Sequence, residues 1–231
     1  MVQHLKLNEE NQYSTIDYSG DGRRFVVAGL KPGIEIWDEE RCQMLYVLSK
    51  DMTMRHTNKI FTVKYFPQSS NMVYSGGWDC NVKFWDIRAG KLTHNLFGTQ
   101  TCGDTIDMAS DSHTFVTAGG SGGEGIQTWD LRKLDNGPLK KIGWTTTKTG
   151  YVSNPLFNSC KFMLGNKFIV AGGTDNKVPA KCFNAHTGDL IESFPHLSRS
   201  CFSLDVSQDS SQVVFGDADG KCHFENVNFT Y

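Results

Sequence analysis

The chain has 231 residues, with 23 Lys and Arg against 25 Asp and Glu, and a formal net charge of −2. No basic run is present that could neutralise a series of phosphates, so nucleic acid is not expected as the main partner. Hydrophobic residues make up 39% and aromatic residues 12%, enough to bury a sizeable core, which excludes an intrinsically disordered chain.

Residues 1–11 are polar and charged, and about 18 consecutive apolar residues occur nowhere, so we expect neither a secretory signal nor membrane insertion. The seven cysteines are an odd number and lie far apart, which disfavours a disulfide framework and a zinc ribbon. No histidine pair has metal-ligand spacing, so no metal or cofactor is expected. These features favour a cytoplasmic protein, with nuclear or cytoskeleton-associated locations as alternatives.

One pattern recurs five times along the chain: an aromatic residue followed by an acidic residue or Asn. The pairs are Trp37-Asp38, Trp85-Asp86, Trp129-Asp130, Phe183-Asn184 and Phe224-Glu225. Their spacing is close to the ~40–45-residue period of propeller blades, and only the interval between the third and fourth pairs requires a real insertion.

Each pair ends the third of three short strands separated by polar turns, and a fourth strand precedes the next repeat. The strands of the second repeat, for example, are expected at 60–65, 72–75, 82–85 and 92–97. The repeats span about 13–50, 56–98, 103–144, 156–195 and 200–231, and we expect a single domain over residues 1–231. The last repeat has little room for a fourth strand, and residues 2–8 are a possible closing strand.

In the second repeat, His56, Ser75, Asp79 and Trp85 stand where the WD-repeat family has a buried hydrogen-bonded chain of these residue types. The sequence therefore resembles that family over nearly its whole length, although Arg55 replaces the usual Gly. The resemblance implies an all-β WD-repeat β-propeller with five recognisable four-stranded blades, and a structural role for the four residues. Most family members have seven blades, so a small closed ring, a piece of a longer propeller and an open ring remain alternatives.

Loops at the two ends of such a scaffold carry most binding residues. At one end we expect protein-binding candidates in the turns before the first strands and between the second and third strands. They are Lys59, Phe61, Trp78, Phe157, Arg199 and Asp217. Trp78 is the strongest because Trp dominates binding hot spots, and the alternative is that it folds back over its own blade.

At the opposite end, Arg88 and Arg132 each follow a Trp by three residues. This arrangement is similar to the paired motif of WD-repeat substrate receptors that dock on the adaptor of cullin-type ubiquitin ligases. The alternative is that each Arg pairs with the Asp of its own blade.

The segment 119–125 matches both a dinucleotide-binding fingerprint and a nucleophile elbow. Both motifs require a following helix, whereas residues 126–130 read as a strand, so a glycine-rich hairpin loop is expected there.

We therefore expect a non-catalytic scaffold for other proteins, with no small-molecule substrate. If the ring is open, we expect a partner to complete its edge. One alternative is a ubiquitin-ligase substrate receptor. A weaker alternative is a propeller enzyme with its site at the channel mouth.

Overall fold

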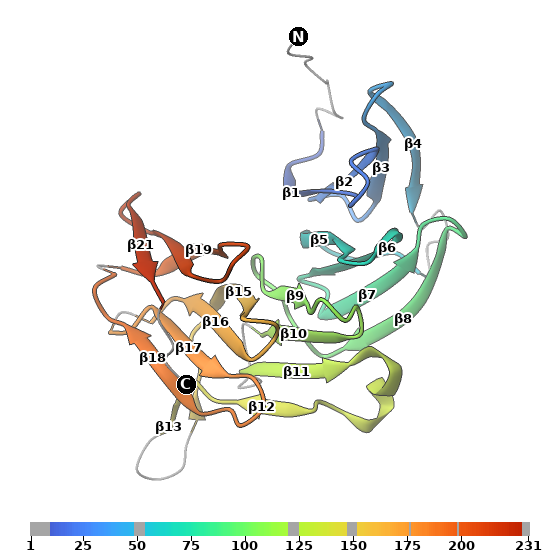
Figure 1. Ribbon diagram of the computed structural model, residues 1–231. Coiled ribbons are helices and arrows are strands. Elements are labelled where there is room, and N and C mark those ends of the chain that lie inside the picture. Colours follow the sequence, from blue (N-terminus) through green and yellow to red (C-terminus); the bar gives the residue numbers. More distant parts are fainter. Residues whose placement is uncertain are drawn as a thin grey trace. The chain divides into compact units, whose positions relative to one another are not determined.

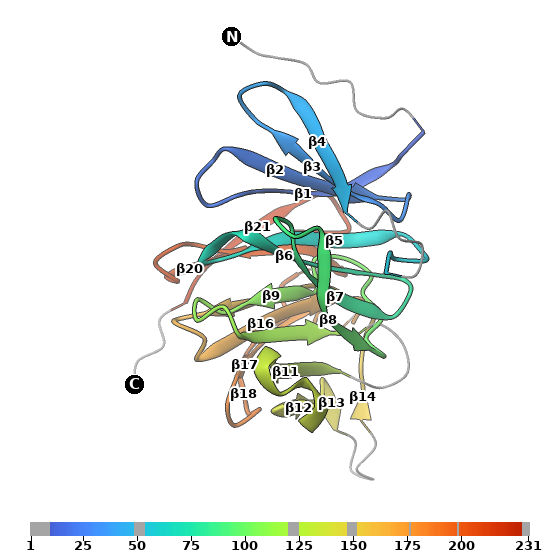
Figure 2. The same cartoon turned by 90° about the vertical axis from the view of Figure 1, so that its right-hand side faces the viewer.

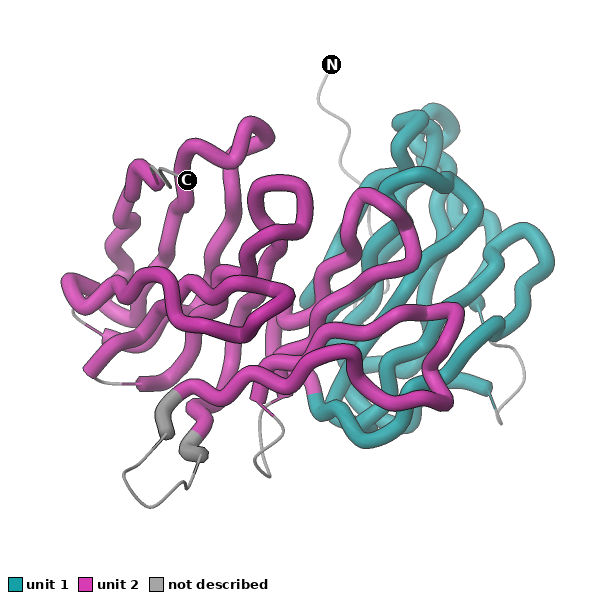
Figure 3. Tube along the Cα trace, turned by 60° about the horizontal axis from the view of Figure 1, so that its bottom comes forward, with its two compact units in different colours: residues 1–100 teal, residues 101–231 magenta. Residues whose placement is uncertain are grey.

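The structure is a computed structural model that describes residues 10–48, 54–119, 125–146, 152–175, 177–197 and 199–227. The described elements are strands, apart from one short 3-10 helix (Figure 1). The chain divides into two compact units, residues 1–100 and residues 101–231 (Figure 3). The single-domain organisation stays a prediction.

Unit 1 contains two four-stranded antiparallel sheets, each with its strands in chain order. The first sheet consists of β1 (Tyr13–Tyr18), β2 (Arg24–Gly29), β3 (Ile34–Asp38) and β4 (Gln43–Leu48). The second consists of β5 (Ile60–Phe66), β6 (Ser69–Gly77), β7 (Asn81–Asp86) and β8 (Lys91–Phe97).

Among its described residues, unit 2 contains three further sheets with their strands in chain order, besides one two-stranded sheet. The third sheet consists of β9 (Ile106–Met108), β10 (Thr114–Ala118), β11 (Ile126–Asp130) and β12 (Lys140–Ile142). The fourth consists of β15 (Phe157–Met163), β16 (Phe168–Gly173), β17 (Ala180–Asn184) and β18 (Leu190–Phe194). The fifth consists of β19 (Cys201–Val206), β20 (Gln212–Asp217) and β21 (Cys222–Asn226). The predicted all-β fold of repeated antiparallel sheets is confirmed.

The long third interval is filled by local additions, as its length predicts. The 3-10 helix η1 (Leu131–Asn136) follows β11, and a hairpin of β13 (Thr145–Thr146) and β14 (Val152–Ser153) follows β12 (Figure 2). Asp130 caps η1 by accepting from the backbone N–H of Arg132.

Within each unit, consecutive sheets pack through their first strands. Asp17 of β1 accepts a hydrogen bond from the Tyr65 backbone N–H at 2.8 Å, and Asp107 of β9 accepts one from the Phe162 backbone N–H at 2.9 Å. Apolar side chains of the facing strands form the cores, such as Val26, Ile36, Val63 and Trp85 in unit 1. Radially repeated sheets that meet along their first strands are the packing expected of propeller blades.

A β-bulge at the start of the first strand gives a common reference for four of the sheets. It lies between Tyr13 and Thr15, Ile60 and Thr62, Phe157 and Ser159, and Cys201 and Ser203. In the first, second and fourth sheets a glycine lies opposite the start of this bulge: a Cβ at Gly77 would collide with the Lys59 carbonyl oxygen, and a Cβ at Gly29 with that of Gln12. In the fifth sheet Asp217 takes this place.

Counting pairs from the bulge corrects the alignment of the last repeat. Trp85 lies opposite Val73 and Phe183 opposite Ile169, but the equivalent residue in the fifth sheet is Glu225, opposite Val213. The prediction that Phe224 takes the Trp position was wrong by one residue. A shift of one residue places a side chain on the other face of a strand, and Phe224 is accordingly 70% exposed.

The fifth sheet has three strands among the described residues instead of the predicted four. The possible closing strand, residues 2–8, lies outside the described residues, as do residues 120–124 of the glycine-rich loop. A strand that completes the fifth sheet, from this chain or from a partner, stays a prediction.

Candidate functional site

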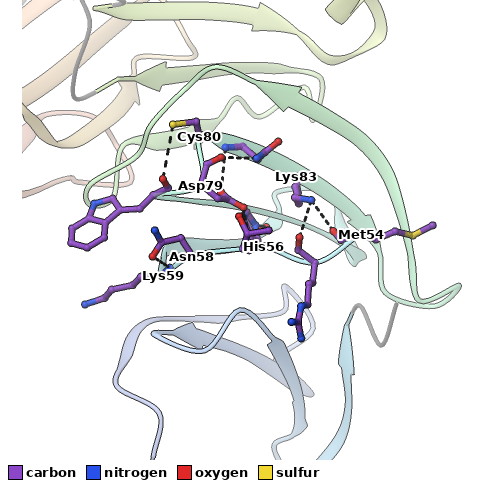
Figure 4. Close-up of polar contacts among 12 residues, drawn as sticks. Met54, His56, Asn58, Lys59, Asp79, Cys80 and Lys83 are labelled. Carbon is purple, nitrogen blue, oxygen red and sulfur yellow. Dashed lines mark hydrogen bonds and ion pairs between the residues drawn. The ribbon is translucent and has the colours of Figure 1, made fainter. Parts of the chain in front are cut away.

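A buried polar network links the segment before β5 to β6, β7 and the turn between them (Figure 4). His56 Nδ1 lies 2.8 Å from Asp79 Oδ2, and His56 Nε2 lies 2.7 Å from Ser75 Oγ. Trp85 Nε1 donates to Ser75 Oγ at 2.9 Å. Because the Asp79 carboxylate can only accept, His56 Nδ1 carries the proton that faces it. In the neutral imidazole, Nε2 then accepts from the Ser75 hydroxyl, whose oxygen accepts from the indole. Every member of the chain is thereby satisfied.

The Asp79 carboxylate is held in its charged form. Burial opposes ionisation, but the hydrogen bond and charge of His56 and the backbone N–H groups of Thr57 and Asn81 outweigh it, and the pKa of Asp79 is lowered. The side chains of His56 and Asp79 are 0% and 1% exposed. Both side chains are closed to solvent, and the carboxylate bonds the backbone of the turn and of the segment before β5.

Other sheets keep parts of this network. In the third, Trp129 Nε1 donates to Thr117 Oγ1 at 3.0 Å. In the fourth, Phe183 occupies the Trp position and has no donor, and Trp144 supplies the indole instead by donating to Asp175 Oδ2 at 2.7 Å. The role of Trp144 could not be predicted from the sequence, because its partner lies 31 residues away.

Buried lysines recur at one position of two sheets, another feature that sequence reasoning did not identify. Lys83 of β7 donates to the Met54 and Arg55 carbonyls, and Lys181 of β17 donates to the Trp144 carbonyl. Burial lowers the pKa of both amines. Each lysine fastens the segment that precedes its sheet. Both lysines stand two residues before the aromatic residue of their repeat, so the repeat alignment contained the information needed to pair them.

Three candidates gather at one end of the second sheet, and we call Lys59, Phe61 and Trp78 the Trp78 patch. The Phe61 and Trp78 rings lie 5.0 Å apart at an interplanar angle of 49°, and Lys59 Nζ lies 4.9 Å from the Phe61 ring centre. Trp78 contacts its own blade through Phe61 and still remains 46% exposed. Figure 4 shows Lys59 beside Asn58, on the segment that leads to β5.

The turn that carries Trp78 is fastened from several directions. The Trp78 backbone N–H donates to the Lys59 carbonyl at 3.0 Å. Asp79 binds the backbone N–H groups of Thr57 and Asn81, at 3.1 and 3.2 Å. The exposed patch therefore sits on a turn that is anchored to the buried network beneath it.

Leu30 is a further candidate that the sequence analysis overlooked. Its backbone N–H donates to the Gln12 carbonyl as that of Trp78 does to Lys59, so Leu30 occupies the equivalent turn position of the first sheet. Its side chain is 47% exposed. The signal was available, since Leu30 follows Gly29 as Trp78 follows Gly77.

Two candidates at the same end of their blades belong to the interior. Phe157 is fully buried and packs against Trp144, with ring centres 5.4 Å apart, so its side chain offers no surface to a partner. Asp217 has a side chain that is 0% exposed, and it accepts from His223 and from the backbone N–H groups of Asp219 and Lys221. The prediction that these two side chains contact a partner is therefore corrected. Phe157 is a core side chain, and Asp217 is a carboxylate that fixes a turn. Sequence spacing could place them at a blade end but could not reveal their burial.

The remaining candidates are exposed arginines. Arg199 forms an ion pair with Asp219 at 3.0 Å and is 69% exposed. Arg132 makes two hydrogen bonds to Asp130, at 2.9 and 2.8 Å, and this hydrogen bonding holds the pKa of the Asp130 carboxyl well below its usual range. Arg88 is 79% exposed, and its guanidinium lies 3.9 Å from Asp86. The pairing of an arginine with the Asp of its own blade is thus tight at Arg132 and loose at Arg88.

Among the residues that the structure describes, no group of three or more His, Cys, Asp or Glu side chains could hold a metal ion. No helix within the described ranges is long and apolar enough to cross a membrane.

A protein-family model described as "WD domain, G-beta repeat" matches residues 48–86, the stretch that contains the buried network. Over 211 residues the chain is 26% identical to autophagy-related protein 16 of Arabidopsis thaliana, covering 88% of this chain and 37% of that protein. It is 27% identical to the small ribosomal subunit protein RACK1 of Caenorhabditis elegans, covering 71% of this chain and 48% of that protein. A third relative, the Denticleless protein homolog A of Xenopus laevis, is 29% identical over 46% of this chain and 15% of its own length. The chain thus matches less than half the length of each of these relatives.

Proposed function

We propose that this chain, which belongs to the WD-repeat family, is a non-catalytic platform that binds other proteins through the Trp78 patch. The observation that carries the proposal is an indole that stays 46% exposed on a turn anchored to a fully satisfied buried network. A large apolar surface held in one conformation loses little entropy on binding, and Trp is the residue type most enriched in hot spots.

The relatives support a role in protein assemblies, because their names include an autophagy-related protein and a ribosomal subunit protein. We further propose the cytoplasm as the compartment. All seven cysteines are free, as expected where thiols stay reduced.

The proposal predicts that truncating Trp78 removes partners. In affinity purification of the tagged full chain from its native source, quantified by mass spectrometry, Trp78→Ala should lower the recovery of the main partners at least about fivefold. Phe97→Ala is the matched control, because Phe97 lies in the same unit and is 77% exposed. Capture of no protein above the untagged background, or equal recovery with Trp78→Ala, would overturn the proposal.

A second candidate function, that of a ubiquitin-ligase substrate receptor, uses Arg88. The observation in its favour is a guanidinium that is 79% exposed and only loosely paired, and therefore available to a partner. Arg132 favours this function less, since both of its bonds to Asp130 would have to be replaced.

A further inference from the structure

The Trp78 patch has a charge as well as an apolar surface. Lys59 is partly buried against the Phe61 ring and pairs with no acidic side chain within the described ranges of the chain. The nearest carboxylate along the turn, Asp79, is 1% exposed and is occupied by His56 and two backbone N–H groups. At this patch, an ammonium group without a carboxylate partner lies against the Phe61 ring, which in turn packs against the exposed indole of Trp78.

The residues that precede Lys59 likewise contribute no negative charge. Thr57 and Asn58, which lead to Lys59, are exposed and uncharged. At the equivalent turn of the first sheet, Leu30 is exposed, and Lys31 is paired with Glu10 at 2.8 Å. Unlike Lys31, Lys59 keeps its charge available for a partner.

We propose that the Trp78 patch binds an acidic peptide segment, in which a carboxylate side chain stands beside an apolar or aromatic one. The carboxylate forms an ion pair with Lys59, and the apolar side chain covers the Trp78 indole. A carboxylate brought to Lys59, whose ammonium lies against the Phe61 ring, is partly desolvated, which strengthens the ion pair relative to one in open solvent. This inference rests on the proposed function and specifies the chemistry of the partner.

The whole-chain charge of −2 gives an acidic ligand no long-range attraction. Selectivity for acidic segments must therefore come from the local contact with Lys59. A single charge reversal at this residue is then sufficient to change the preference.

The test is selection of a displayed random 12-residue peptide library on the immobilised full chain, followed by fluorescence anisotropy with the enriched peptides. We expect enrichment of Asp or Glu next to Phe, Trp, Leu or Met. Lys59→Glu and Trp78→Ala should each weaken binding of the enriched peptides at least about tenfold. The matched controls, Lys91→Glu and Phe97→Ala, change an exposed lysine and an exposed aromatic of the same unit and should leave binding within about twofold.

Selection on the Lys59→Glu chain should favour Lys or Arg in place of the acids, which a loss of folding would not produce. Enrichment of basic or purely apolar peptides by the unaltered chain, or of no sequence at all, overturns the inference. So does equal binding by Lys59→Glu. If partners are captured in a Trp78-dependent way while acidic peptides are not selected, the peptide chemistry fails and the proposed function stands. If no protein is captured, the proposed function itself fails.

Discussion

Four side chains of the second repeat show how a buried polar group can stabilise a fold. Asp79, His56, Ser75 and Trp85 form a chain in which each donor meets an acceptor. A buried carboxylate without such partners would destabilise the fold, whereas a fully connected one fixes the backbone around it. The turn that bears Trp78 depends on this arrangement.

The charge of Asp79 should therefore contribute to stability. We expect Asp79→Asn to lower the free energy of unfolding by about 1–3 kcal/mol at neutral pH. The reason is that His56 and two backbone N–H groups would then donate to a neutral amide in place of a charged carboxylate. Chemical denaturation measures this difference, and Glu40→Gln, a change at an exposed acid of the same unit, should have almost no effect.

The pH dependence has a definite sign. The folded-state pKa of Asp79 lies below the ordinary value of an aspartate, so its contribution is complete above that ordinary value and is lost as the pH falls through the folded pKa. The gap between the wild type and Asp79→Asn should shrink in that acidic range. A gap that stays constant or widens there would show that the carboxylate charge does not stabilise the fold.

The network residues could be predicted because each has a distinct chemical type at a characteristic place in the repeat. Trp144 could not, because its contact with Asp175 joins residues 31 positions apart across two sheets. Burial of Phe157 and Asp217 also escaped prediction. Position near a blade end does not specify whether a side chain turns inward.

Strand register explains both the success and the error in the repeat alignment. Alternating apolar residues and turns predicted the strands of all five sheets, since their period of two is visible in the sequence. In the last repeat the aromatic-acidic pair suggested Phe224 for a position that Glu225 occupies. Glu225 pairs there with His196 at 2.6 Å, which a search for aromatic residues cannot detect.

This register makes a quantitative prediction for two phenylalanines. Phe183→Ala should cost about 3–5 kcal/mol because Phe183 is 2% exposed, whereas Phe224→Ala should change stability by less than about 0.5 kcal/mol because Phe224 is 70% exposed. Urea unfolding of the two variants gives both values. Comparable losses for the two would mean that Phe224 is buried and that the register described for β21 is incorrect.

Repetition of one supersecondary unit organises the whole chain and places its turns at two sets of blade ends. One set carries the Trp78 patch, and the other carries Arg88 and Arg132. The family and the sheet order followed from the sequence because both depend on the repeat. The proposed binding end rests instead on exposure and side-chain pairing, which are seen only in the folded chain.

Hydrogen–deuterium exchange of the full chain, alone and bound to the partner recovered most strongly by affinity purification, tests the proposed binding end directly. We predict that slowed exchange on binding concentrates in residues 57–61 and 77–81, around the Trp78 patch. Slowed exchange confined to residues 86–89 and 130–133, around Arg88 and Arg132, would contradict the proposal and favour the opposite end of the blades.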